Sequence, residues 1–187
     1  MYFEKFHEAS KRSLAFGVLE NNVIGLCTER FLENESVLER VLSAINAETS
    51  HLTPEEISAT SFGLHTRLCQ AIALATSIPI YLTIGYVSLQ GQKLFYTSEE
   101  ALKSYLGGRS PQALNLHTWL TLPSMEIIDV TLSTSIGLNQ REPELFGNIV
   151  TKHPDELSGG LAYHPQLLGI DYFDNIGATY IINSKFD

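Results

Sequence analysis

The chain lacks several features that assign proteins to common classes. Its 187 residues include only two cysteines, Cys27 and Cys69, and they form no disulfide framework. No apolar run is long enough to cross a membrane, and the start, MYFEKFHEASKR, is not that of a secretory signal. Internal repeats and Gly/Ser/Pro linkers are also absent. We therefore expect a cytoplasmic protein without a membrane partner. Export by a route that needs no such signal is left open.

Positive charge is scarce as well. Twelve Lys and Arg stand against 21 Asp and Glu, which gives a formal net charge of −9. The acidic residues are spread along the chain, and such a surface repels phosphate backbones, so no nucleic-acid partner is expected. Hydrophobic residues make up 44% of the chain, including nine Phe and eight Tyr. This is enough for a single domain over residues 1–187 to bury its core without disulfides or metals.

The familiar motifs of metal and nucleotide sites are missing too. The six histidines show neither H-x-x-x-H spacing nor a C-x-x-C companion, so we expect no metal ligands and no cofactor. There is no G-x-S-x-G elbow and no P-loop.

The first 60 residues have the pattern of helices. Capping-box spacing begins at Ser36, and the apolar residues that follow fall on one helical face: Val37, Leu38, Val41, Leu42 and Ile45. A second helix start is Thr53 as the cap, with Pro54 in the first helical position and Glu56 three residues after the cap.

After residue 60 the pattern changes from helical to extended. An apolar stripe with helical spacing runs to about residue 76 and bears Cys69, and Pro79 closes it. Strands are predicted over 80–87, 93–96, 116–122, 126–132 and 178–183, with a short helix over 97–107 and a loop-rich stretch over 137–160. The expected class is therefore α+β, with a helical part (1–60) and a Cys-bearing helix packed on a mostly antiparallel sheet (within 61–187).

Three residues on these elements have the types needed for nucleophilic catalysis. His117 follows Cys69 by 48 residues (117 − 69), and Asp129 lies 12 further on (129 − 117). A hairpin centred on Pro123 pairs residues whose numbers sum to 246, as those of His117 and Asp129 do. We therefore expect these two to be cross-strand neighbours, with Trp119 on the same face.

The chemistry explains why these types matter. A thiolate is the nucleophile, and an imidazole close by removes the thiol proton and stabilises the ion pair. A carboxylate on the other ring nitrogen holds the imidazole in the correct tautomer. A catalytic triad of Cys69, His117 and Asp129 is the resulting hypothesis.

The segments CQAIALATSIPIYLTIGYV and HTWLTLPSMEIIDVT resemble the transglutaminase-like, papain-like superfamily, in which a Cys helix leads through "IP" to "GYV" before an "H-x-W … D-x-T" block. The resemblance covers about 65 residues. It implies cysteine-dependent acyl transfer, as in amide hydrolases, deamidases and transglutaminases, with a peptide, protein or small amide as substrate. By this resemblance Cys69 is the nucleophile, His117 the general base and acid, and Asp129 the orienting group.

The match departs from the family pattern at the helix. Many members have a longer helix between the Cys and the "IP", and counting back from Pro79 by that length lands near Ser61 and Phe62. Ser61 is therefore a rival nucleophile position. No oxyanion donor beyond the backbone N–H of Cys69 stands out. Candidates to contact the oxyanion or substrate are the side chains of His65, Arg67, Gln70 and Trp119.

Other interpretations remain open. Cys69 among apolar neighbours on a helix also fits a small core residue. Trp119 fits a core position as well as a pocket wall. A non-catalytic module that keeps the fold and binds a peptide or protein is the alternative to an enzyme, and it predicts a thiol with an ordinary or raised pKa. The oligomeric state and the role of residues 1–60 are left undetermined by the sequence.

Overall fold

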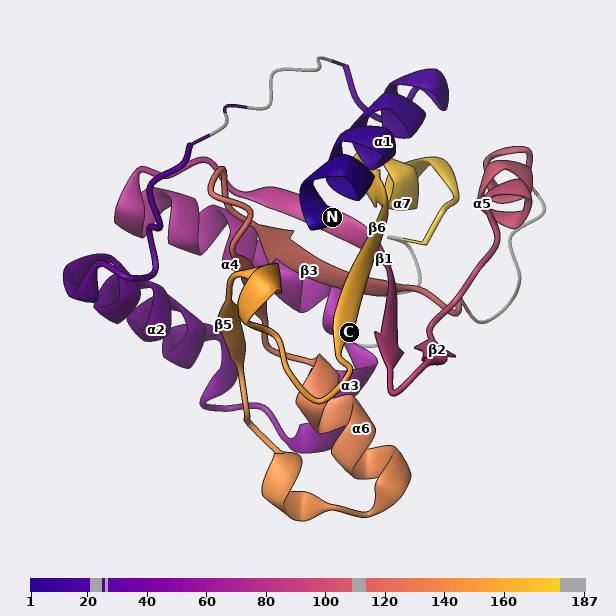
Figure 1. The fold of residues 1–187 in the computed structure, drawn as a ribbon. Helices are drawn as coiled ribbons and strands as arrows, with labels where there is room; N and C mark the ends of the chain where they lie inside the picture. Colours follow the sequence, from indigo (N-terminus) through magenta and orange to yellow (C-terminus); the bar gives the residue numbers. More distant parts are fainter. Residues whose placement is uncertain (21–24, 26, 109–113, 179–187) are drawn as a thin grey trace. The chain divides into compact units, whose positions relative to one another are not determined.

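The computed structural model describes residues 1–20, 25, 27–108 and 114–178, and these form an α+β protein (Figure 1). Its chain divides into two compact units that interleave along the sequence. The described residues of unit 1 are 1–20, 83–108, 114–118 and 157–178, and those of unit 2 are 25, 27–82 and 119–156. Unit 2 runs through residue 60 without a break, so the helical part expected over 1–60 is shared between the units. The expectation of a single domain stays a prediction.

Unit 1 is built on antiparallel strands with a helix along one of them. Strand β1 (Tyr81–Leu89) enters this unit at Thr83 and pairs with β2 (Gln92–Leu94) and β6 (Ala162–Leu168). Helix α1 (Tyr2–Ala15) packs along β6, where Ser13 Oγ accepts a 2.7 Å hydrogen bond from the backbone N–H of Leu168. The unit also contains α5 (Glu99–Leu106) and α7 (Asp171–Asn175).

Unit 2 combines helices with a short antiparallel sheet. Its helices are α2 (Glu35–Thr49), α3 (Pro54–Ala59), α4 (Ser61–Thr76) and α6 (Leu132–Gln140), with short 3₁₀ turns η1 (Pro143–Leu145) and η2 (Pro154–Glu156). Strand β3 (His117–Thr121) enters this unit at Trp119 and pairs with β4 (Ile127–Asp129), which pairs in turn with β5 (Val150–Lys152).

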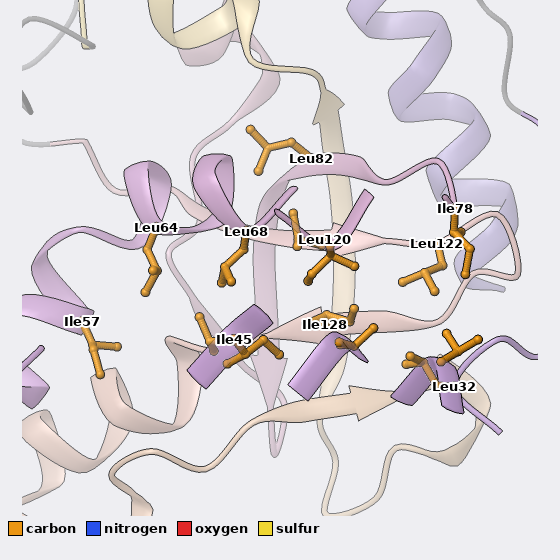
Figure 2. Close-up of a cluster of buried hydrophobic side chains, with 14 residues drawn as sticks. Leu32, Ile45, Ile57, Leu64, Leu68, Ile78, Leu82, Leu120, Leu122 and Ile128 are labelled. Atoms are coloured by element: carbon orange, nitrogen blue, oxygen red, sulfur yellow. The ribbon is translucent and has the colours of Figure 1, made fainter. Parts of the chain in front are cut away.

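The hydrophobic core of unit 2 forms where α2 and α4 pack together over strands β3 and β4 (Figure 2). The apolar stripe predicted on α4 is confirmed at Leu64, Leu68 and Ile72, which are all fully buried, and is wrong at its last residue, Ala75, which is exposed. Truncating one such side chain to Ala costs about 2–5 kcal/mol. Helix α4 ends at Thr76, and the left-handed backbone of the next residue, Ser77 (φ 59°), stops the helix two residues before Pro79.

Several local predictions hold, and others are wrong at identifiable points. The cap at Thr53 is confirmed, with reciprocal hydrogen bonds between Thr53 and Glu56 of 2.8 and 3.2 Å. Helix α2 is capped by Asn34 instead of Ser36, and Leu42, expected on the buried face, is 41% exposed. The stretch 137–160 is not all loop, because it holds the end of α6 and all of β5. The strand expected over 178–183 lies almost wholly outside the described residues.

The register of the β3–β4 hairpin differs from the expected one. Leu120 pairs with Ile128, so paired residue numbers sum to 248, and Asp129 lies in register with Trp119 instead of His117. The turn is a three-residue loop over 123–125, closed by Leu122 and Glu126 and ending on a left-handed Met125 (φ 67°). The predicted centre at Pro123 was one residue too early, because the pair that closes the loop is Leu122 and Glu126, which centres the turn on Ser124.

Candidate functional site

The residues of the predicted triad belong to both units. Cys69 and Asp129 lie in unit 2, on α4 and at the end of β4, whereas His117 lies in unit 1 at the start of β3. His117 is buried, and its ring stacks on Phe95 with centroids 5.0 Å apart. Trp119 is buried in unit 2, and Gln70 is exposed on α4. The triad as a whole stays a prediction.

Cys69 lies in the middle of α4, far from the start of the helix. Its thiol donates a weak hydrogen bond of 3.4 Å to the carbonyl oxygen of Ile80. Burial raises the pKa of the Cys69 thiol, and a smaller opposing effect comes from a hydrogen bond with the backbone of Leu82. The thiol is therefore held in its protonated form at neutral pH, which is the state of a core cysteine and not of a thiolate nucleophile.

Ser61, unlike Cys69, lies at a helix start, because it is the first residue of α4. It precedes Cys69 by eight residues, or about 12 Å along a helix axis. Its hydroxyl exchanges a hydrogen bond of 2.9 Å with the hydroxyl of Thr131, the residue before α6. A helix start favours negative charge nearby, so an oxyanion formed at Ser61 would be stabilised there more than one formed at Cys69.

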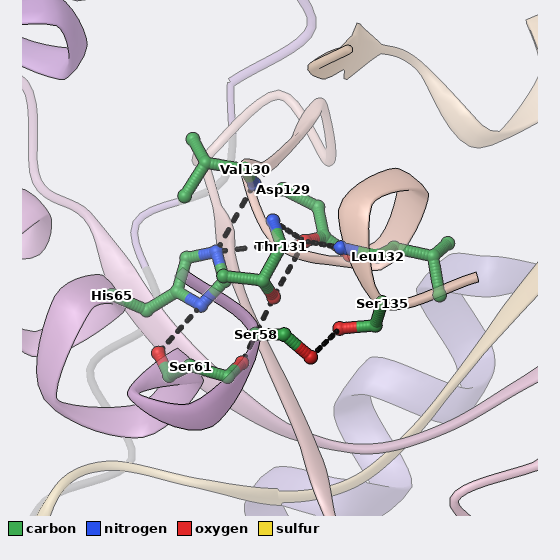
Figure 3. A network of polar contacts seen from close by, with 8 residues as sticks. All are labelled: Ser58, Ser61, His65, Asp129, Val130, Thr131, Leu132 and Ser135. Atoms are coloured by element: carbon green, nitrogen blue, oxygen red, sulfur yellow. Dashed lines mark hydrogen bonds and ion pairs between the residues drawn. The ribbon is translucent and has the colours of Figure 1, made fainter. Parts of the chain in front are cut away.

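His65, one turn after Ser61, is fully buried and uses both ring nitrogens (Figure 3). Nδ1 lies 2.9 Å from the carbonyl oxygen of Ser61, and Nε2 lies 3.3 Å from the backbone nitrogen of Val130. A carbonyl only accepts and a backbone N–H only donates, so Nδ1 carries the proton and Nε2 accepts. His65 is therefore neutral in this arrangement, and its approach of 3.6 Å to Asp129 Oδ1 is not an ion pair. Its one ring proton is engaged, which removes His65 as an oxyanion donor.

Asp129 caps the start of α6. Its Oδ1 accepts hydrogen bonds from the backbone N–H groups of Thr131 (2.9 Å) and Leu132 (3.1 Å), and lies 3.3 Å from the Thr131 hydroxyl. Such contacts satisfy backbone donors that a helix start otherwise leaves without partners. Thr131 was expected as a strand residue and as the last position of the D-x-T block. Its role follows from the fact that β4 ends at Asp129 and a helix begins three residues later.

A second hydroxyl pair lies beside these residues. Ser58 on α3 and Ser135 on α6 are 2.9 Å apart through their Oγ atoms. Among the residues drawn in Figure 3, we call the six whose polar side chains meet the polar cluster: Ser58, Ser61, His65, Asp129, Thr131 and Ser135. The cluster joins the starts of α4 and α6. The sequence singled out four of its members, Ser61, His65, Asp129 and Thr131. Ser58 and Ser135 belong to no sequence motif, so a pattern search could not have found this hydroxyl pair.

The other features considered from the sequence do not add to this cluster. Arg67 donates from Nε to Glu48 at 2.8 Å on the surface of unit 2. Over the described residues, no group of three or more His, Cys, Asp or Glu is placed to hold a metal ion. Within the same ranges, no helix has the length and apolar character needed to cross a membrane.

Comparisons with known proteins add little. No family model matches the sequence, and no curated protein matches it either. One solved crystal structure, of the protein called genomics APC5867, is similar over 84% of this chain and 76% of its own, with 13% identity and a TM-score of 0.47.

Proposed function

We propose that this chain is an acyl-transfer enzyme of the transglutaminase-like type whose nucleophile is Ser61, at the start of α4. The observation that carries the proposal is the extent of α4, from Ser61 to Thr76. The family that the sequence resembles has a full-length helix between its nucleophile and the "IP" segment. Here that length separates Ser61, and not Cys69, from Ile78-Pro79.

The local geometry supports Ser61 over Cys69. A helix start offers a positive electrostatic potential to a developing oxyanion, and Ser61 stands there while Cys69 lies two turns further on. Burial raises the pKa of Cys69, which disfavours the thiolate that a cysteine nucleophile needs. Cys69 as the nucleophile remains the sequence-based alternative, and it requires a base strong enough to overcome that burial.

The proposed reaction has two steps. Ser61 Oγ attacks the carbonyl carbon of an amide or ester, its proton passes to an imidazole, and the leaving amine or alcohol takes that proton. Water or an amine then attacks the acyl-enzyme and releases Ser61. His117 enters as the base through the sequence resemblance. Asp129 is its expected orienting group, and its position is held by the caps it gives Thr131 and Leu132. A peptide, a protein side-chain amide or a small amide is the expected substrate.

A serine-directed probe tests the assignment. The full chain is incubated with a fluorophosphonate, which labels activated serines, and the labelled residue is located by mass spectrometry. We expect labelling at Ser61 in the wild-type chain and in Cys69→Ala, and loss of labelling in Ser61→Ala and His117→Ala. Labelling that survives Ser61→Ala, or a probe that reacts with no residue, would contradict the proposal.

A matched cysteine variant compares the two positions directly. In a Cys27→Ser, Cys69→Ala background, Ser61→Cys places a thiol at the helix start, and alkylation by iodoacetamide is followed against pH. We expect the thiolate at position 61 to form below the ordinary thiol pKa of about 8.5, and that of Cys69 in a Cys27→Ser chain to form above it. The reverse order would restore Cys69 as the nucleophile.

One observation favours a second function, a non-catalytic binding module. The Ser61 hydroxyl is already bonded to Thr131, and the Cys69 thiol is held protonated, so both candidate nucleophiles are engaged in structural contacts. Thr131→Val separates the two functions. An enzyme should respond with a changed rate of fluorophosphonate labelling, because the hydroxyl pair at the nucleophile is lost. A binding module should show no labelling with either residue at position 131.

A further inference from the structure

Unit 1 carries a group of basic and aromatic residues that takes no part in the proposed reaction. The register of its strands places Tyr86 directly opposite His164, and Ser88 directly opposite Lys93. Tyr86 and Ser88 are two residues apart on β1 and so point to the same face, which means that all four side chains share one face of the strands. Lys5 reaches this face from α1, and Tyr96 from the segment after β2. We call these six residues the Lys5–Lys93 patch.

His164 is the centre of the patch. Its Nδ1 lies 2.8 Å from Lys5 Nζ, and its Nε2 lies 2.8 Å from Ser88 Oγ. An ammonium group only donates, so Nδ1 accepts and the ring proton stays on Nε2. The ring also stacks on Tyr86, with centroids 4.4 Å apart and planes 7° from parallel. His164 is therefore held as a neutral imidazole between a cation and an aromatic ring.

Lys93 approaches the same stack of rings from β2. Its Nζ lies 5.4 Å from the centroid of Tyr86 and 4.2 Å from that of Tyr96, and the two tyrosine rings meet edge to face at 5.0 Å. Both ammonium groups of the patch are thus bound to neutral groups. Within the described ranges, neither Lys5 nor Lys93 forms an ion pair with a carboxylate.

The electrostatics agree with an excess of positive charge at this place. Partial burial, and then the charges of Lys5 and Lys93, lower the pKa of His164 to about 4. A bound anion would relieve that repulsion, because it lies close to both ammonium groups and attracts a proton to the ring between them. We propose that the Lys5–Lys93 patch is a binding surface for an acidic peptide segment, whose carboxylates meet Lys5 and Lys93 and whose side chains rest on Tyr86 and Tyr96.

A peptide with carboxylates fits this surface better than an inorganic anion or a nucleic acid. No arginine belongs to the patch, so its two lysines act as point charges that single carboxylate oxygens can meet, and the tyrosines beside them add a contact surface that an inorganic anion could not use. A nucleic acid carries a charge on every phosphate along its length, so the net charge of −9 repels it more strongly than a short peptide with a few carboxylates. Tyr96 is 42% exposed, which leaves an aromatic surface beside Lys93 for the apolar part of a peptide side chain. The inference is independent of the proposed acyl transfer.

The test measures binding of a short fluorescein-labelled peptide rich in glutamate to the full chain, by fluorescence anisotropy at low ionic strength. The same peptide with glutamine in place of glutamate is the ligand control. We expect the glutamate peptide to bind and Lys5→Ala or Lys93→Ala to weaken it about three- to fivefold each, as for the loss of one exposed ion pair. Lys11→Ala, which removes the same charge from the exposed side of α1, is the protein control and should change binding less than twofold.

Two further readings make the result decisive. The pKa of His164, followed by NMR and assigned with His164→Gln, should rise from about 4 when the glutamate peptide is added and stay unchanged with the glutamine peptide. Inorganic phosphate at matched ionic strength should displace the peptide no better than chloride does. Equal binding of both peptides, equal effects of Lys11→Ala and Lys93→Ala, an unmoved His164 pKa, or displacement by phosphate would each overturn the proposal.

Discussion

Replacing Asp129 separates its structural role from any role in catalysis. In Asp129→Ala, the buried backbone N–H groups of Thr131 and Leu132 lose their acceptor. Each buried donor left without a partner costs about 1–3 kcal/mol, so the variant should lose about 2–6 kcal/mol of unfolding free energy. That is a large part of the 5–15 kcal/mol of a typical domain. In Asp129→Asn the amide oxygen can still accept from both groups, and Asn is as good a cap as Asp, so the loss should be about 1 kcal/mol.

The single tryptophan gives a suitable assay. Trp119 is the only Trp in the chain and is fully buried in unit 2, so its fluorescence in a urea titration reports the unfolding of the unit that contains Asp129. Asp155→Ala is the control, because this carboxylate is 72% exposed and lies 3.4 Å from His153, and its loss should cost less than about 0.5 kcal/mol. If Asn and Ala at position 129 destabilise equally, the negative charge matters and the capping argument is wrong. If both cost less than the control, the bonds contribute nothing measurable.

If Asp129 also orients a catalytic imidazole, the labelling of the two variants should not follow their unfolding free energies. Asp129→Asn should then remain folded and yet lose fluorophosphonate labelling at Ser61, because a neutral amide cannot stabilise an imidazolium. Labelling that follows stability alone, high in Asn and low in Ala, would show that Asp129 acts only as the cap of α6.

Other consequences of the structure can be measured in the same way. Glu126→Ala should cost about 3–5 kcal/mol in the Trp fluorescence titration, because its buried carboxylate accepts from two backbone N–H groups and a hydroxyl; Glu156→Ala, at an exposed ion pair, should cost less than about 1 kcal/mol. Gly137→Ala should destabilise by about 1–3 kcal/mol instead of stabilising a helix, since its Cβ would lie 2.7 Å from the backbone oxygen of Glu142, and an unfolding free energy equal to or above that of wild type would contradict this. His164 has a lowered pKa of about 4 in the folded chain, so its contribution to stability is complete above about pH 6.5 and is lost as the pH falls through 4; a pH series of urea titrations followed by far-UV circular dichroism should show a smaller acid loss in His164→Gln.

Predictions that depend on neighbours in the chain were the successful ones. The cap at Thr53, the buried stripe through Leu64 and Ile72 and the change to a strand after Pro79 all rest on spacings of two to four residues. At that range, backbone geometry fixes which side chains can meet, so a residue pattern is enough. The prediction failed at Ser36, where a good capping pattern was present but Asn34, two residues earlier, made the bond.

The hairpin shows where a pattern stops being sufficient. The sequence placed His117 and Asp129 on adjoining strands, but their register depended on the turn. The left-handed backbone of Met125 is rare for a residue with a side chain, and no local sequence pattern predicts it. The shift of two residues kept the predicted face and changed the partner, because side chains alternate with a period of two.

The chain by itself determined the α+β class, the positions of most helices and strands and the residue types available for catalysis, because these follow from composition and short-range periodicity. Only the tertiary structure decided which of those residues has which chemistry. Cys69 became a protonated thiol because it is partly buried against the hydrophobic core of unit 2, and Ser61 became the helix-start residue beside Thr131, 70 residues away. Protonation and hydrogen bonding depend on the local dielectric and on partners brought together by folding, and a linear pattern carries neither.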